Sequence, residues 1–257
     1  MTRLIVARLA QFPLVLAAIY LLTFALVWVA PGDPFQKGDR RPSEAAIRAL
    51  KERFHADTWY GFLTHYPLSM LRGDFGPSFF HDGFSVNDRL RQALPVSITI
   101  GVAAILIAVV AGVGLGVTAA ARRGGPVDWL SVAVALAGVS FPSFVVAGLL
   151  TLVLCIQLDW FPIARWGRWQ DVILPAFSLS LLPMAYIARL IRVSMLDVLS
   201  SDYIRTARAK GASRMAVVWK HAVPNAILPV LSYLGPATAL ALTGSFVVEK
   251  VFSIPGL

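Results

Sequence analysis

The stretch that decides the fold is LAQFPLVLAAIYLLTFALVWVA, residues 9–30, which contains no charged side chain over 22 positions. A helix that rises about 1.5 Å per residue needs about 20 apolar residues to cross the hydrocarbon core of a bilayer. Twelve of the 22 residues are Leu, Ile, Val or Phe, so the segment is apolar enough to insert. The run is longer than the roughly 7–15 residues of a signal-peptide core, which disfavours a cleaved leader.

Four more segments follow the same pattern. The sequence predicts further spans over residues 95–121, 129–158, 172–196 and 222–248. Pro142 interrupts the third span, which a bilayer tolerates when neighbouring helices satisfy the freed backbone groups. Arg192, near the end of the fourth, is expected to extend its guanidinium to water. Gly112, Gly114 and Gly116 either let another helix approach the second span closely or are simply a small-residue stretch. The predicted class is an all-α polytopic membrane protein with five spans.

The composition agrees with a membrane location. Apolar residues make up 57% of the chain and charged residues only 14%, against roughly 25% charged residues in a soluble domain. A soluble enzyme, a disordered tail and a nucleic-acid-binding protein are therefore excluded. The single cysteine, Cys155, rules out a disulfide framework, and no two histidines lie three or four residues apart. We therefore predict no metal site.

The distribution of the net charge of +9 predicts the orientation. Five spans in series place the N-terminus, the loop near residue 122 and the segment from residue 197 on one side. That side carries 11 basic and three acidic residues, whereas the other carries 12 and 11. Because cytoplasmic loops are rich in Lys and Arg, we expect a cytoplasmic N-terminus and an extracytoplasmic loop over residues 31–94. Pro42-Ser43-Glu44 opens a short helix in this loop, with Phe54 among its apolar positions.

The segment SSDYIRTARAKGASRMAVVWKHAVPN, residues 200–225, is long enough to fold. Gly211 suits a left-handed helix end, Ser213 can cap a following helix, and Ser201 or Asp202 can cap the preceding one. The second helix has a predicted apolar stripe of Met215, Val218, Trp219 and Ala222. The residues alone leave two interpretations open: a helical pair that docks into a partner, or an amphipathic helix held on anionic lipid.

The same segment resembles the cytoplasmic loop of type I ABC importer permeases. Their pattern of EAA, three residues, Gly, nine residues, Ile, one residue and Leu-Pro falls on Arg205-Thr206-Ala207, Gly211, His221 and Val223-Pro224. The chain departs from this pattern in having Arg for Glu and His for Ile. Its YIRTARAKG stretch is similar to the form of the loop found in the peptide-importer branch of the family. Further stretches resemble the B-type oligopeptide permease subunit: PGDP (31–34), GDFGPSF (73–79), SVND (85–88), FPSFVVA (141–147) and PVLSYLGPA (229–237).

This resemblance implies an organisation and a set of partners. It implies a first helix at 1–30, an extracytoplasmic loop at 31–94 and an ABC type I transmembrane domain at 95–257, with a coupling loop at 197–223. Such permeases have six spans, so we expect a sixth helix to be missing after SIPGL (253–257). The implied partners are a second permease subunit, an extracytoplasmic binding protein and two ATPase subunits in a bacterial inner membrane. The implied cargo is peptides, most of all oligopeptides; dipeptides, glutathione or a nickel or other metal chelate are alternatives.

The expected functional residues follow from this assignment. We expect no catalytic residue and no cofactor in this subunit, because no G-x-x-x-x-G-K-[ST] motif is present; ATP and Mg would bind the partner ATPases. The residues expected to dock the ATPase are Tyr203, Arg205, Thr206, Ala207, Lys210, Gly211, Ala212, Ser213, His221 and Pro224. The candidates for the translocation pathway are Ser140, Ser143, Ser178, Ser180, Thr243 and Ser245, whose hydroxyls can equally bond to nearby carbonyls. The candidates for binding-protein contact are Trp59, Tyr60, Phe79 and Phe80.

The sequence also bears on functions of other classes. No Asp or Glu lies within a predicted span, which counts against transport driven by protons or cations. Ser140 lacks a nucleophile-elbow motif and no histidine lies in a span, which disfavours an intramembrane hydrolase. The composition leaves two other interpretations open: an ATP-independent channel and a structural membrane subunit.

Overall fold

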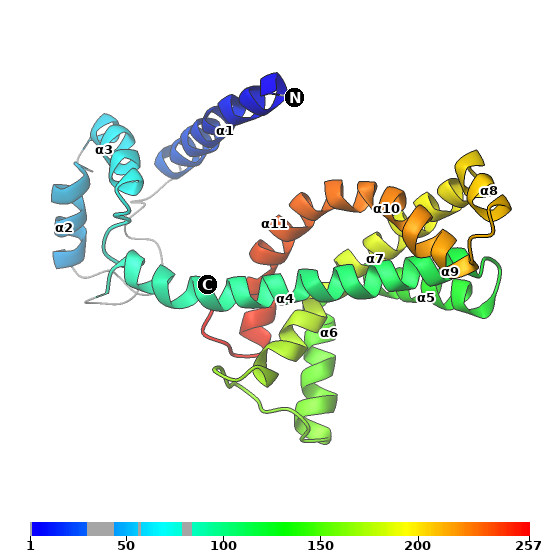
Figure 1. Cartoon of the computed structure of the whole chain (residues 1–257). Coiled ribbons are helices and arrows are strands. Elements are labelled where there is room, and N and C mark those ends of the chain that lie inside the picture. Colours follow the sequence, from blue (N-terminus) through cyan, green and yellow to red (C-terminus); the bar gives the residue numbers. More distant parts are fainter. Residues whose placement is uncertain (1, 30–43, 56–57, 79–83) are drawn as a thin grey trace. The chain divides into compact units, whose positions relative to one another are not determined.

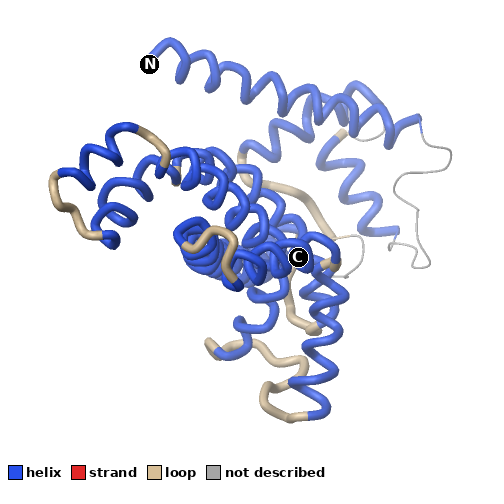
Figure 2. The backbone as a smooth tube through the Cα atoms, turned by 90° about the vertical axis from the view of Figure 1, so that its right-hand side faces the viewer, coloured by secondary structure: helices blue, strands red, loops and turns tan. Residues whose placement is uncertain are grey.

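The computed structural model describes residues 2–29, 44–55, 58–78 and 84–257. Within these ranges every regular element is a helix, apart from one isolated antiparallel bridge between Pro77 and Ser85 (Figure 2). The predicted all-α class is confirmed. The chain forms two compact units, Met1–Arg91 and Gln92–Leu257, and the boundary falls within the first turns of helix α4 (Val86–Ala121).

The first unit contains α1 (Thr2–Val29), α2 (Glu44–Phe54) and α3 (Trp59–Leu71) (Figure 1). Helix α1 contains the first span and leaves its apolar side chains exposed, as a lipid-facing helix does. The hydroxyl of Tyr20 on α1 donates to the carbonyl of Leu63 on α3 at 3.2 Å. Helix α2 is the short helix predicted to follow Pro42-Ser43-Glu44, and the ring of Phe54, one of its predicted apolar positions, is fully buried against Tyr66. Burial, with a further contribution from the charge of Asp74, raises the pKa of Tyr66.

Two short motifs of the first unit are bonded to each other. Asn87 accepts a hydrogen bond from the backbone N–H of Phe75 at 2.9 Å and donates to the carbonyl of Gly73. Ser85 and Asp88 exchange bonds at the start of α4: the Ser85 hydroxyl donates to the carboxylate at 2.6 Å, and the Asp88 N–H donates to that hydroxyl at 3.1 Å. The SVND stretch therefore both caps α4 and holds the GDFGPSF stretch.

The second unit contains the remaining spans. Helices α4, α7 (Gln170–Leu199) and α11 (Leu228–Val251) are each long and apolar enough to cross a membrane. A bent pair, α5 (Pro126–Ser140) followed by α6 (Ser143–Leu150) and the π-helix η1 (Thr151–Gln157), has the length and apolarity of a fifth crossing only when its two parts are taken together. The pair bends by 101°.

The predicted span over residues 129–158 is interrupted at Pro142, as expected, but the break turns the chain sharply rather than leaving one continuous crossing helix. Pro142 has no N–H to donate and disfavours helical geometry at the residue before it. Phe141 is accordingly extended, with φ −98° and ψ 122°, and α5 ends at Ser140. The last span is also displaced from its predicted bounds, because α11 begins at Leu228 and continues through Glu249.

Two apolar clusters form the core of the second unit. One surrounds Ile187, Ile191 and Met195 of α7 and includes residues of α4 and of the segment after α7. The other surrounds Ile100, Ala147 and Val248. Helix α4 packs closely on α7 at Gly116, where an added Cβ would lie 2.6 Å from the carbonyl oxygen of Ala188 and 2.8 Å from the Cβ of Ile191. Such close packing requires a residue without a side chain.

Candidate functional site

The segment after α7 folds as the predicted helix, turn and helix. It comprises α8 (Asp202–Ala209), α9 (Arg214–Ala216), the π-helix η2 (Val217–Ala222) and α10 (Val223–Ala226). Gly211 has φ +82°, in the left-handed region that glycine adopts without strain. The Ser213 hydroxyl accepts from the N–H of Ala216 at 3.3 Å, as a helix cap does. Ser201 precedes α8, but its hydroxyl donates backwards to the carbonyl of Val198.

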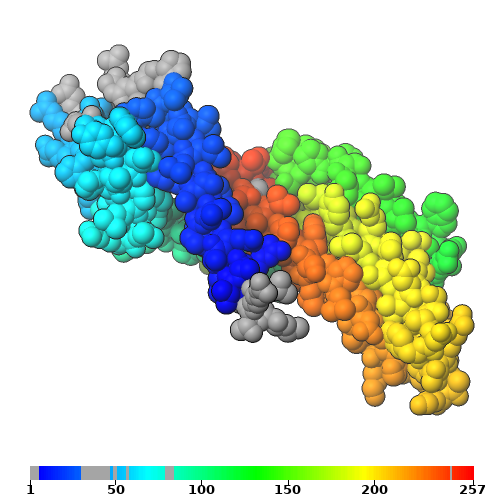
Figure 3. All heavy atoms as spheres, turned by 90° about the horizontal axis from the view of Figure 1, so that it is seen from above, coloured from blue at the N-terminus to red at the C-terminus, as the bar shows by residue number. Residues whose placement is uncertain are grey.

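Contacts of three residues hold this hairpin together and fasten it to the membrane helices. Ile204 of α8 is fully buried in the same cluster as Ile187 and Met195 of α7. The Tyr203 hydroxyl donates to the carbonyl of His221 at 3.3 Å and accepts from the amide of Asn225 at 2.9 Å. The Arg214 guanidinium donates to the carbonyl of Ala121, the last residue of α4. Figure 3 shows α7 and α8 in yellow beside η2 and α10 in orange.

The predicted apolar stripe is only partly right. Val218 and Ala222 are buried, but the side chains of Met215 and Trp219 are 66% and 49% exposed. Their place in the core is taken by Val217, which is buried. The backbone from 217 to 222 is a π-helix, whose hydrogen bonds run from i to i+5 and whose wider turn shifts the buried face away from the expected α-helical period.

Most residues expected to dock an ATPase lie on the exposed side of the hairpin. Exposed members are Tyr203, Arg205, Thr206, Lys210, Gly211, Ser213 and Pro224, whereas Ala207, Ala212 and His221 are half-buried. An added Cβ at Gly211 would have no neighbour within 4 Å in the part of the chain that the structure describes. The outer side of the turn at Gly211 is thus open, so a partner can approach it.

The bend between α5 and α6 borders a cavity of about 310 Å³. Ser140, Phe141 and Ser143 line it from the bend, and Tyr233 and Ala237 line it from α11. The FPSFVVA and PVLSYLGPA stretches, far apart in the sequence, therefore meet at one cavity. Residues of α7 complete its wall.

The other pathway candidates do not line this cavity. Ser178, Ser180 and Ser245 are fully buried, and their hydroxyls donate to the carbonyls of Leu174, Phe177 and Leu242 in their own helices. Thr243 is exposed and donates to the carbonyl of Ala239 at 2.9 Å. Of the six candidates, Ser140 and Ser143 are the two that the structure brings together at a cavity.

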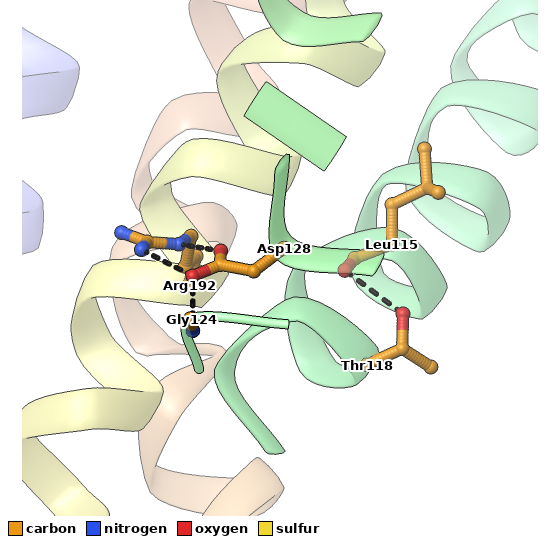
Figure 4. A network of polar contacts seen from close by, with 5 residues as sticks. All are labelled: Leu115, Thr118, Gly124, Asp128 and Arg192. Carbon is orange, nitrogen blue, oxygen red and sulfur yellow. Dashed lines mark hydrogen bonds and ion pairs between the residues drawn. The ribbon is translucent and has the colours of Figure 1, made fainter. Parts of the chain in front are cut away.

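A charged pair that the sequence did not predict joins α5 to α7 (Figure 4). The Asp128 carboxylate accepts from Nε and Nη2 of Arg192 at 2.6 and 2.9 Å, and from the N–H of Gly124 at 3.0 Å. Asp128 is only 6% exposed. The expectation that Arg192 extends to water is therefore wrong, because a bidentate carboxylate satisfies its guanidinium within the protein. The sequence gives only a weak indication of this pair. Its two opposite charges are 64 residues apart, on the same predicted side of the membrane.

The candidates for binding-protein contact are described in part. Trp59 and Tyr60 are exposed in the first turn of α3, with ring centroids 5.8 Å apart. Phe79 and Phe80 lie outside the described residues, as does the PGDP stretch. Within the described ranges, no three or more His, Cys, Asp or Glu residues are grouped so that they can hold a metal ion.

Comparison with known proteins gives consistent matches. Residues 112–257 match the family described as binding-protein-dependent transport system inner membrane component. The chain is 43% identical to the dipeptide transport system permease protein of Bacillus subtilis (strain 168), over 100% of this chain and 83% of that protein. It is 41% identical to the oligopeptide transport system permease protein of Salmonella typhimurium, over 92% and 78%. A crystal structure of an amino acid ABC transporter aligns with a TM-score of 0.49 and 18% identity, over 73% of this chain and 78% of that one.

Proposed function

The chain belongs to the family of binding-protein-dependent transport system inner membrane components, and on this basis we propose that it is the permease subunit of an ATP-driven peptide importer. Relatives of 43% and 41% identity are named as dipeptide and oligopeptide permeases. Oligopeptides are the proposed cargo, with dipeptides the first alternative because a dipeptide permease matches the whole chain. The observation that carries the proposal is the exposed hairpin built on Gly211 and fastened to the spans.

The energy source lies in partner subunits. The permease is not itself an ATPase, and its sequence has no phosphate-binding loop. We propose that two ATPase subunits bind ATP and Mg and contact the hairpin on the cytoplasmic side. A second permease subunit would complete the pathway, and an extracytoplasmic binding protein would deliver the peptide near Trp59 and Tyr60.

The contacts of the hairpin explain how motion would pass to the spans. Ile204 lies in the same core as α7, Tyr203 bonds to η2 and α10, and Arg214 bonds to the end of α4. A push on the turn at Gly211 would therefore move these elements as one body rather than deform a loose loop. Rotation of packed helices between two arrangements is a common form of such switching.

The test of the coupling role is substitution at Gly211. Gly211→Asp and Gly211→Asn should insert normally but abolish ATP hydrolysis stimulated by the binding protein in proteoliposomes. The matched control is Gly124→Asn, because Gly124 also has a left-handed φ, of +76°, and open space around it. Coupled hydrolysis at the wild-type rate in both Gly211 variants would refute the docking role. Peptide uptake without ATP would instead identify a channel.

A second test concerns the cavity at the bend. Ser143→Cys should react with a small thiol reagent when the transporter turns over, because Ser143 lines the cavity. Ser178→Cys should stay unreactive, because Ser178 is fully buried. The native Cys155 is 4% exposed and gives a low background. If peptide fails to slow labelling of Ser143→Cys, the cavity is not part of the pathway.

A further inference from the structure

We propose that the second unit binds the headgroup of an anionic phospholipid in a groove of about 590 Å³ at the ends of α4 and α7. Three arginines line this basic groove: Arg123 follows α4, Arg208 lies on α8 and Arg214 on α9. The proposal does not depend on which solute the permease carries.

The charges of the basic groove are not balanced within the protein. Its lining contains no Asp or Glu. Among the described residues, the ion pairs at this end of the unit are Arg192 with Asp128 and Arg205 with Asp202, and neither involves the lining arginines. Asp128, whose charge acts on Arg123, is already bonded to Arg192 and to the N–H of Gly124. Guanidinium groups gathered around one cavity repel one another unless an anion lies between them.

The remaining walls favour a lipid over a water-soluble anion. Leu196, Leu199 and Val218 give the basic groove an apolar side beneath the guanidinium groups. Helices α4 and α7 are membrane spans that end here, so the groove lies at the level of the lipid headgroups. Arginine pairs with phosphate through two parallel hydrogen bonds, and the apolar wall suits the start of an acyl chain.

The groove adjoins the surface proposed to meet the ATPase without including its exposed turn. Ala212 lines the groove, whereas Gly211 and Ser213 on either side of it do not. A lipid in the groove would contact α4, α8 and α9 at once. It would thereby add a second attachment, besides the bond from Arg214 to Ala121, between the hairpin and the spans.

Native mass spectrometry of the full-length permease, extracted in detergent with its partner subunits, tests the proposal. The probes are phosphatidylglycerol, phosphatidylcholine and inorganic phosphate. Arg123→Gln combined with Arg208→Gln should weaken phosphatidylglycerol binding about thirtyfold, from about 1 kcal/mol per basic residue near an anionic headgroup. Arg122→Gln combined with Lys220→Gln removes the same charge from exposed positions outside the groove and should leave binding unchanged. Arg214 is kept because it bonds to Ala121.

A conservative variant guards against loss of fold. Arg123→Lys combined with Arg208→Lys should keep a preference for phosphatidylglycerol over phosphatidylcholine, since the charge is retained. Wild-type phosphatidylglycerol binding in the Gln variant, or equal binding of both lipids, would overturn the proposal. Displacement of the lipid by inorganic phosphate would identify a free-anion site instead. Loss of the ATPase subunits with unchanged lipid binding would assign these arginines to the protein interface and equally overturn it.

Discussion

At the residue scale, the pairing of Asp128 with Arg192 gives the clearest test of what holds the spans together. Asp128 occupies the first turn of α5 and Arg192 lies on α7, so their two bonds join helices that are separated in the chain by α6 and η1. The carboxylate is almost fully enclosed, whereas the Arg205–Asp202 pair on the hairpin is exposed, with side chains 75% and 94% accessible. Removing one member of an enclosed pair leaves the other charge without compensation, and exposed pairs contribute little.

Asp128→Asn should therefore lower the melting temperature of the detergent-solubilised permease by several degrees, because Arg192 loses its charged partner. Asp202→Asn is the matched control and should leave the melting temperature unchanged. The measurement is thermal unfolding followed by tryptophan fluorescence. Equal melting curves for the two variants would show that the pair does not stabilise the packing of α5 on α7.

The same residues show where sequence reasoning succeeds and where it stops. Gly211 and Ser213 were predictable because a left-handed helix end and a helix cap are local properties. The partner of Arg192 was not, since only the packing of α5 on α7 brings residues 128 and 192 together. Met215 and Trp219 were misplaced because a π-helical turn, which the α-helical period does not anticipate, shifts the buried face.

At the element scale, α4 and α7 touch where glycine leaves room. An added Cβ at Gly116 would meet the carbonyl oxygen of Ala188 and the Cβ of Ile191, whereas one at Gly114 would have no neighbour within 4 Å among the described residues. From the sequence, either glycine could allow another helix to approach or simply belong to a small-residue stretch. In the structure the close approach occurs at Gly116 and, one turn earlier, at Gly112.

Gly116→Ala should destabilise the permease by about 1–3 kcal/mol, the usual cost of inserting a methyl group into a tight contact. The contacting atom at 2.6 Å is a backbone oxygen, which cannot turn aside as a flexible side chain does. Gly114→Ala should be neutral or stabilise by up to about 1 kcal/mol, because alanine favours the helix over glycine. Chemical unfolding in mild detergent measures both. A stability equal to wild type in Gly116→Ala would mean that the two helices separate at little cost.

At the scale of the whole molecule, charge and hydropathy together predicted where the apolar helices lie but not their shape. Four helices are long and apolar enough to cross, and the fifth predicted span is a helix pair bent by 101°. The length of an uncharged segment predicts that it crosses the membrane. It does not predict the direction in which the helix continues after a break such as the one at Pro142. The cavity at the bend depends on residues of α5, α6, α7 and α11 meeting in space, so it was not visible in any single stretch.

The topology inferred from charge leads to the last prediction. Seven of the 11 inner basic residues lie between Arg205 and Lys220 or directly after α4, so the hairpin and the turn after α4 should share the cytoplasmic side. Ala209→Cys, exposed at the end of α8, should react with a membrane-impermeant thiol reagent only in inverted vesicles. Arg72→Cys, exposed after α3, should react only from the outside of intact cells. The unsubstituted chain, whose one cysteine is buried, should react from neither side.

Reaction of both variants from the same side would require an even number of crossings between residues 72 and 209, and would overturn the interpretation of the bent pair α5 and α6–η1 as a complete span.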